Sequence, residues 1–154
     1  MTAPSQLADE LRQWARGSYG LEAGTELLVR SFGGRFARPS WPWIKEDHGR
    51  HGIDFGAIPE HSGALPGGER RVLLITASLA EETPVVLGDV LAGLDRKHLE
   101  LVTAAVSHAA GAHQQVEFLP TRIDDGVDVI VPWGPRVELG PVYPWPSEDH
   151  GIGL

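Results

Sequence analysis

The sequence contains no cysteine, and this absence excludes several kinds of chemistry at once. Disulfide bonds, thiolate metal ligands and cysteine nucleophiles all require the thiol group. Long apolar runs are missing too, because no stretch approaches the roughly 18 residues that a membrane-spanning helix needs. The first residues, MTAPSQLADELRQW, lack the basic start and apolar core of a secretory signal. We therefore expect a cytoplasmic protein that does not bind membranes.

Lysine and positive charge are both scarce. Of the 13 basic residues only Lys45 and Lys97 are lysine, and 21 acidic residues give a net charge of −8. A protein that binds duplex nucleic acid would carry a basic stripe instead. We therefore expect no duplex nucleic-acid partner. The preference for arginine over lysine, with many alanines and glycines, is typical of a high-GC bacterial genome and predicts a bacterial origin.

The remaining composition is that of an ordinary soluble globular protein. The chain has 154 residues, of which 42% are hydrophobic and 22% are charged. A domain of this length buries roughly 68–70% of the surface that its unfolded chain exposes, so it needs no disulfide or metal to fold. We predict a single domain over residues 1–154.

Apolar periodicity, interrupted by glycine and proline, divides the first half of the chain into two segments. Residues 1–34 predict a helical hairpin with helices over residues 5–16 and 21–31, each followed by a glycine that ends it. The second of these helices carries too few basic residues to read DNA. Residues 35–66 hold several prolines and glycines between aromatic residues. They predict an irregular loop whose apolar side chains pack down.

The second half of the chain divides into three segments. Residues 67–111 predict a helical core with helices over residues 67–79 and 94–110, and the short apolar run between them is either a strand or the start of a helix. Residues 112–140 predict a β-hairpin, because apolar and polar residues alternate on both sides of an Asp-Asp-Gly turn. Residues 141–154 predict an extended tail. The expected fold class is α+β and mostly helical, with a C-terminal β-hairpin and a tail rich in proline and tryptophan.

Residues 41–49 and residues 143–151 share a sequence pattern. They read WPWIKEDHG and YPWPSEDHG, so both have an aromatic residue, Pro-Trp, two further residues and then Glu-Asp-His-Gly. Tryptophan and tyrosine are enriched at interface hot spots, and proline-rich extended segments dock at low entropic cost. We therefore predict that this loop and tail bind a protein partner or a second copy of the chain. The residues expected to make the contact are Trp41, Trp43, Tyr143 and Trp145.

The first of these two segments also gathers side chains that bind metals. Imidazole and carboxylate groups are ligands of Zn, Fe and Mn sites, and in a loop they can converge on one ion. The simpler interpretation is that these polar residues form solvated turns, since no HExxH spacing on a helix accompanies them. No other cofactor is expected. The residues of this alternative site for a divalent transition metal are Asp47, His48, His51 and Asp54, with Asp149 and His150 as candidates from the tail.

Two histidines fall on the predicted helix over residues 94–110. His98 and His108 are ten residues apart, which is roughly 15 Å along a helix axis. That separation is too large for the two side chains to share one ion. We expect both to be histidines at the edge of the core or on the surface.

Residues 65–95 hold three short motifs, which read LPGGERR at 65–71, VVLGD at 85–89 and AGLD at 92–95. In this order they resemble the signature loop, Walker B strand and D-loop of ABC-type ATPases. The resemblance implies a place beside a nucleotide. Pro66 stands where that family has a serine that contacts the γ-phosphate, and Val90 stands where it has the catalytic glutamate. No G-x-x-x-x-G-K-[ST] loop is present to cradle phosphates.

No complete catalytic motif is legible, so we expect a protein without catalytic activity. The leading hypothesis is a small accessory protein that docks through its aromatic-proline loop and its tail. A metal-binding protein or metal-dependent enzyme is one alternative. A regulator that docks beside a nucleotide-binding partner is the other.

Overall fold

Apolar residues spaced three and four positions apart produce the longest helices of the chain. The computed structural model describes residues 3–123 and 126–147. In the first helix, for example, Leu7, Leu11 and Ala15 share the buried face. The architecture is α+β and mostly helical, which confirms the predicted fold class. The long helices are α1 Pro4–Ala15, α2 Tyr19–Arg30, α4 Gly67–Ala80 and α6 Arg96–Ala109.

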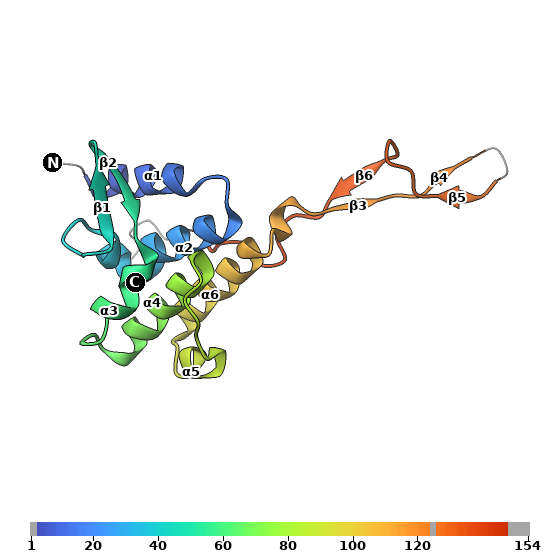
Figure 1. Cartoon of the computed structure of the whole chain (residues 1–154). Coiled ribbons are helices and arrows are strands. Elements are labelled where there is room, and N and C mark those ends of the chain that lie inside the picture. Colours follow the sequence, from blue (N-terminus) through green and yellow to red (C-terminus); the bar gives the residue numbers. More distant parts are fainter. Residues whose placement is uncertain (1–2, 124–125, 148–154) are drawn as a thin grey trace.

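Helix α2 lies between α4 and α6 and packs against both (Figure 1). Gly24 permits the close approach of α2 to α4, because a Cβ atom at this position would lie 2.7 Å from the Cβ of Ala80. One buried cluster joins α1 and α2 to the segment that follows them and includes Phe36, Trp43 and Phe55. A second cluster fills the space between α2, α4 and α6, with Ala23, Leu27, Val72, Ile75, Leu101, Val102 and Ala105.

Residues 35–66 are more regular than the sequence predicts. Strands β1 and β2 pair antiparallel and are joined by two residues, His48 and Gly49. Their φ angles of 50° and 77° are those of a type I′ turn, whose twist suits a tight hairpin. The prediction of an irregular loop is wrong here, because His-Gly is not among the usual sequence signals of this turn. The elements are η1 Ser31–Ala37, β1 Ile44–Asp47, β2 Arg50–Ile53, η2 Phe55–Ala57 and α3 Ile58–His61.

The short apolar run between the two core helices forms a helix and not a strand. Helix α5 spans Leu87–Leu91 and buries Val90 against the second cluster. It occupies the position at which the resemblance to ABC-type ATPases places the Walker B strand. Asp95 caps α6, since its carboxylate accepts a hydrogen bond of 2.8 Å from the backbone N–H of His98.

The C-terminal strands form a long two-stranded ribbon that projects away from the helices (Figure 1). We call residues 115–139 the β-arm and residues 3–114 the helical body. Near the body, β3 (Val116–Phe118) pairs antiparallel with β6 (Arg136–Glu138), and farther out β4 (Thr121–Arg122) pairs with β5 (Asp128–Val129). The predicted hairpin is present, although Asp124 and Asp125 of its predicted turn lie outside the described residues.

Beyond the β-arm the chain runs back along the helical body (Figure 1). The backbone N–H of Tyr143 donates a hydrogen bond of 3.2 Å to the hydroxyl of Ser107, and Nη1 of Arg30 donates one of 2.9 Å to the carbonyl oxygen of Pro146. The described part of the predicted tail is therefore held on α2 and α6. Within residues 3–123 and 126–147, no helix combines the length and apolar character that crossing a membrane requires.

Candidate functional site

The four loop residues predicted to bind a metal do not bring their ligand atoms together, although Asp47, His51 and Asp54 line one pocket. Asp47 is the last residue of β1, and His48 lies in the hairpin turn that follows. Their side chains are 88% and 92% exposed and contact each other at 2.7 Å. His51 lies opposite Glu46 in the register of the hairpin, and it contacts Glu10 on α1 at 3.1 Å. Side chains of neighbouring strand residues point to opposite faces, so Asp47 and His51 are separated. Asp149 and His150 lie outside the described residues.

The predicted docking residue Trp43 is fully buried. Its indole N–H donates a hydrogen bond of 2.8 Å to the carbonyl oxygen of Phe36. The ring of Trp41, which is half-buried, stacks on it with a centroid separation of 4.9 Å. The expectation that Trp43 presents its ring to a partner is therefore wrong. The WPW segment is part of the core because the rings of Trp41 and Trp43 pack against Phe36 of η1.

The aromatic residues of the tail contact the helical body. The Trp145 ring is half-buried against the second cluster, with the guanidinium of Arg30 5.1 Å from its centroid. Its centroid is 6.2 Å from that of His108. The Tyr143 side chain is 37% exposed. In the described structure the first half of the tail is therefore bound by this chain itself.

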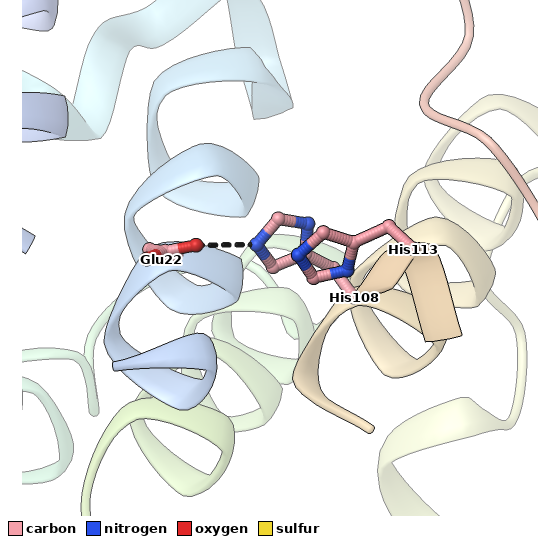
Figure 2. A group of neighbouring side chains, drawn as sticks. All are labelled: Glu22, His108 and His113. Carbon is pink, nitrogen blue, oxygen red and sulfur yellow. Dashed lines mark hydrogen bonds and ion pairs between the residues drawn. The ribbon is translucent and has the colours of Figure 1, made fainter. Parts of the chain in front are cut away.

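Three side chains from separate parts of the chain do converge: Glu22, His108 and His113. Glu22 comes from α2, His108 from the last turn of α6, and His113 from η3 (Ala112–Gln114), the short helix that follows. One ligand atom from each residue lies within 4.8 Å of the others, and no other group of three or more ligand residues meets this criterion in the described part of the chain. Figure 2 shows Glu22 reaching toward the two imidazole rings.

The contacts within this cluster are short. Nε2 of His108 donates a hydrogen bond of 2.8 Å to the carboxylate of Glu22. The rings of His108 and His113 stack with their centroids 3.9 Å apart and their planes 12° from parallel. The Tyr19 ring packs edge-on against His113 at 5.0 Å. The cluster is therefore closed on one side by an aromatic residue from α2.

The end of α6 explains how His113 reaches His108. Gly111 has a φ angle of 75°, in the left-handed region that ends helices and reverses the chain. A Cβ atom at this position would lie 2.9 Å from the Tyr19 ring. Glycine is therefore required at this position both by the backbone conformation and by the close packing of Tyr19. The turn brings His113 back to the face of α6 that carries His108.

Burial and hydrogen bonding set the protonation of the cluster. Burial alone would raise the pKa of Glu22, but hydrogen bonds from His108 and from the backbone N–H of Gly17 outweigh it, so the pKa is lowered. Burial lowers the pKa of His113, and the neighbouring His108 adds to that shift. Glu22 is therefore ionised and His113 neutral at pH 7. The Nδ1 atom of His113 is buried and has no hydrogen-bond partner.

A small polar cleft adjoins the cluster. Its volume is about 190 Å³. Inside it, the hydroxyl of Thr25 is buried without a hydrogen-bond partner. Glu26 forms ion pairs with Arg12 at 2.9 Å and with Arg30 at 2.7 Å. The cleft has room for water or another small polar ligand beside the carboxylate and the imidazole. Its lining residues are Arg12, Ala15, Arg16, Glu22, Thr25, Glu26 and His108.

Two imidazoles and one carboxylate are a ligand set suited to a divalent transition metal, with a further position left for water. Sequence reasoning placed His108 on its helix but missed Glu22 and His113. The only local signal was a second histidine just beyond the glycine that ends α6. Glu22 is 86 residues from His108 in the sequence, so no local pattern joins them.

His98 has a structural role, as the sequence predicts for a histidine at the edge of the core. Its Nδ1 lies 2.9 Å from the carboxylate of Asp95, and its Nε2 accepts a hydrogen bond of 3.2 Å from the backbone N–H of Phe32. The His98 ring also stacks on the Phe32 ring. Nε2 therefore holds η1 to α6, and Nδ1 contacts the residue that caps the start of α6.

Comparison of the chain with protein-family models, with curated proteins and with solved structures gives no match in any of the three. No family or neighbouring structure therefore bears on the resemblance to ABC-type ATPases. Two features of the molecule remain as sources of functional inference. They are the cluster of Glu22, His108 and His113, and the projecting β-arm.

Proposed function

We propose that this chain is a protein-interaction protein whose β-arm binds the helical body of a second copy. The observation that carries the proposal is the exposure of large apolar side chains along the arm. Trp133, for example, is 83% exposed. The others of this kind on the arm are Phe118, Leu119, Ile123, Val127, Ile130, Val137 and Leu139.

The outer part of the β-arm has one apolar and one charged face. Thr121 pairs with Val129, and the backbone N–H of Ile123 bonds to the carbonyl oxygen of Val127, so these four side chains share a face. The opposite face carries the ion pair of Arg122 and Asp128. An isolated two-stranded ribbon is only marginally stable in water, and its unpaired edges invite further contacts. Both properties favour an arm whose apolar face is buried against another protein surface when the protein functions.

The helical body offers an apolar groove of matching character. The groove lies between α4, α5 and α6 and has a volume of about 270 Å³. Leu87 and Leu99 at its edge are 59% and 45% exposed. Because the arm projects away from the body (Figure 1), its outer part does not reach the groove of its own chain. Reciprocal insertion would bury both surfaces in a two-fold dimer. The apolar lining consists of Ile75, Leu79, Val85, Leu87, Leu91, Leu99, Val102 and Val106.

Sedimentation of paired variants tests this proposal. Val127→Asp places a charge on the apolar face of the arm, and Leu99→Glu places one in the groove. We expect the wild type to dimerise and each variant to be monomeric at the same concentration. An equal mixture of the two variants should regain dimers, because one arm and one groove per pair remain intact. Val142→Asp, at an 81% exposed position on neither surface, is the matched control and should dimerise as the wild type does.

Net charge adds a second readout. Each chain carries a charge of −8, so two copies repel at long range. Salt screens that repulsion and strengthens apolar contact, and dimerisation should increase with ionic strength. A wild type that stays monomeric at all salt and protein concentrations would mean that a different protein covers the arm. We propose the cytoplasm as the site of this assembly, since a cysteine-free chain suits a reducing compartment.

A further inference from the structure

We infer that Glu22, His108 and His113 bind one divalent transition metal ion, and that this ion fastens the root of the β-arm to the helical body. The inference goes beyond self-association, because it concerns a ligand site and requires only one copy of the chain. The ligand atoms and the place of the cluster in the fold support it.

The three ligand atoms lie near one another, and coordination of one ion requires the stacked rings of His108 and His113 to turn apart, because the nitrogen lone pairs lie in the ring planes. The ligand atoms lie within 4.8 Å of one another, while zinc binds imidazole nitrogen and carboxylate oxygen at about 2.0–2.2 Å. Nitrogen and oxygen donors without sulfur suit Zn²⁺, Co²⁺, Ni²⁺ or Cu²⁺ better than Ca²⁺ or Mg²⁺. When the ion binds Nε2 of His108, the hydrogen bond between this atom and Glu22 is replaced by metal–ligand bonds, and the ring carries its one proton on Nδ1, so the imidazole stays neutral.

The orientation of His113 is the second observation. Figure 2 shows one ring nitrogen of His113 turned toward Glu22, and this atom, Nε2, is the one that would bind the ion. The other ring nitrogen, Nδ1, is buried without a hydrogen-bond partner. The adjoining cleft of about 190 Å³, which Glu22 and His108 also line, leaves space for a water on the ion.

The position of the cluster determines what a bound ion would do to the β-arm. His113 lies in η3, directly before β3, so it belongs to the outgoing root of the arm. The returning chain is tied to the same place, through the bond from Tyr143 to Ser107 and the contact of Trp145 with His108. Glu22 belongs to α2. An ion held by all three ligands would therefore fix the direction in which the arm leaves the body.

Metal titration of the full-length, tag-free protein tests the inference. We expect calorimetry to show one Zn²⁺ ion bound per chain. Bound Co²⁺ should give the visible absorption bands of a metal site with a low coordination number. Glu22→Gln and His113→Gln keep the size and polarity of each side chain and should weaken Zn²⁺ binding at least tenfold. The control His48→Gln changes a histidine in the turn between β1 and β2 and should bind as the wild type does. Circular dichroism verifies that every variant is folded.

Two further measurements use only the wild-type protein, so they do not require any variant to fold. Zn²⁺ should shift the ring-nitrogen resonances of His108 and His113 while those of His98 stay in place. It should also slow hydrogen exchange of the amides in residues 112–118. Absence of Zn²⁺ binding at about 100 µM, or binding that only the His48 variant removes, would overturn the site. Binding without slower exchange would overturn the fastening of the arm.

Discussion

Glu26 offers a sharp test of how the N-terminal helices are held together. Its carboxylate lies 2.9 Å from Nη2 of Arg12 on α1 and 2.7 Å from Nε of Arg30 at the end of α2. The side chains of Glu26, Arg12 and Arg30 are 18%, 30% and 19% exposed. Glu26→Gln keeps the size of the side chain but leaves two guanidinium groups without their shared anion.

The partial burial sets the expected magnitude. A hydrogen bond to a charged group contributes about 1.5–3 kcal/mol, and breaking a fully buried ion pair costs about 3–5 kcal/mol. Solvent screening reduces both values at a partly exposed site. We therefore expect Glu26→Gln to lower the free energy of unfolding by about 2 kcal/mol at pH 7, measured by urea denaturation. Glu100→Gln is the control: its carboxylate is 40% exposed and 3.9 Å from Arg96, and the change should stay within about 0.5 kcal/mol.

The effect of Glu26→Gln should depend on pH in a defined direction. Burial alone would raise the pKa of Glu26, but the hydrogen bonds from Arg12 and Arg30 outweigh it and lower the pKa below its ordinary value of 4.5. A carboxyl group of this kind stabilises the fold above its unfolded pKa, and the stabilisation is lost as pH falls through the folded pKa. The difference between wild type and variant should therefore be constant from pH 8 to pH 5 and shrink in more acidic solution. An equal difference at pH 7 and pH 3 would refute the reasoning.

Substitutions at Trp43, Gly111 and Asp95 test three further structural features by chemical denaturation. At dilutions where the chain is monomeric, Trp43→Ala should cost about 3–5 kcal/mol because the ring is fully buried, whereas Trp133→Ala at an 83% exposed position should change the free energy of unfolding by less than about 0.5 kcal/mol; equal effects would contradict the assignment of core and arm. Gly111→Ala should cost about 1–2 kcal/mol, because its φ angle of 75° lies in the left-handed region, and a neutral result would contradict the strained turn. Asp95→Ala should cost about 0.5–2 kcal/mol through loss of the α6 cap, which Asp95→Ser should largely restore.

The helices and the buried face of each could be predicted because their signals are local. Leu7, Leu11 and Ala15 repeat with the helical period and end at a glycine, so pattern alone defines α1. The same holds for α6, where Asp95 marks the start and Gly111 the end. The hairpin of β1 and β2 was missed because its turn depends on a histidine at positive φ, which sequence signals seldom indicate.

The candidate sites could not be predicted because they depend on tertiary contacts. Aromatic content at Trp41 and Trp43 indicates binding surfaces and cores equally well, and only packing on Phe36 decides between them. The loop carries residue types that can bind metals, but strand alternation places Asp47 and His51 on opposite faces of the hairpin. Glu22 and His113 come together with His108 only after α2 packs on α6 and the chain reverses.

Cross-linking between copies tests the central proposal, the insertion of the β-arm into the groove of a second chain. The natural sequence has no cysteine, so the variants Val127→Cys and Leu99→Cys each contain a single thiol. When the two variants are mixed and oxidised, they should form mainly the mixed disulfide-linked dimer. A tag that lengthens one chain distinguishes this dimer by size. A mixture with Val142→Cys in place of Val127→Cys should not form it. Failure of the mixed dimer to form at protein concentrations where the wild type self-associates would contradict the proposal.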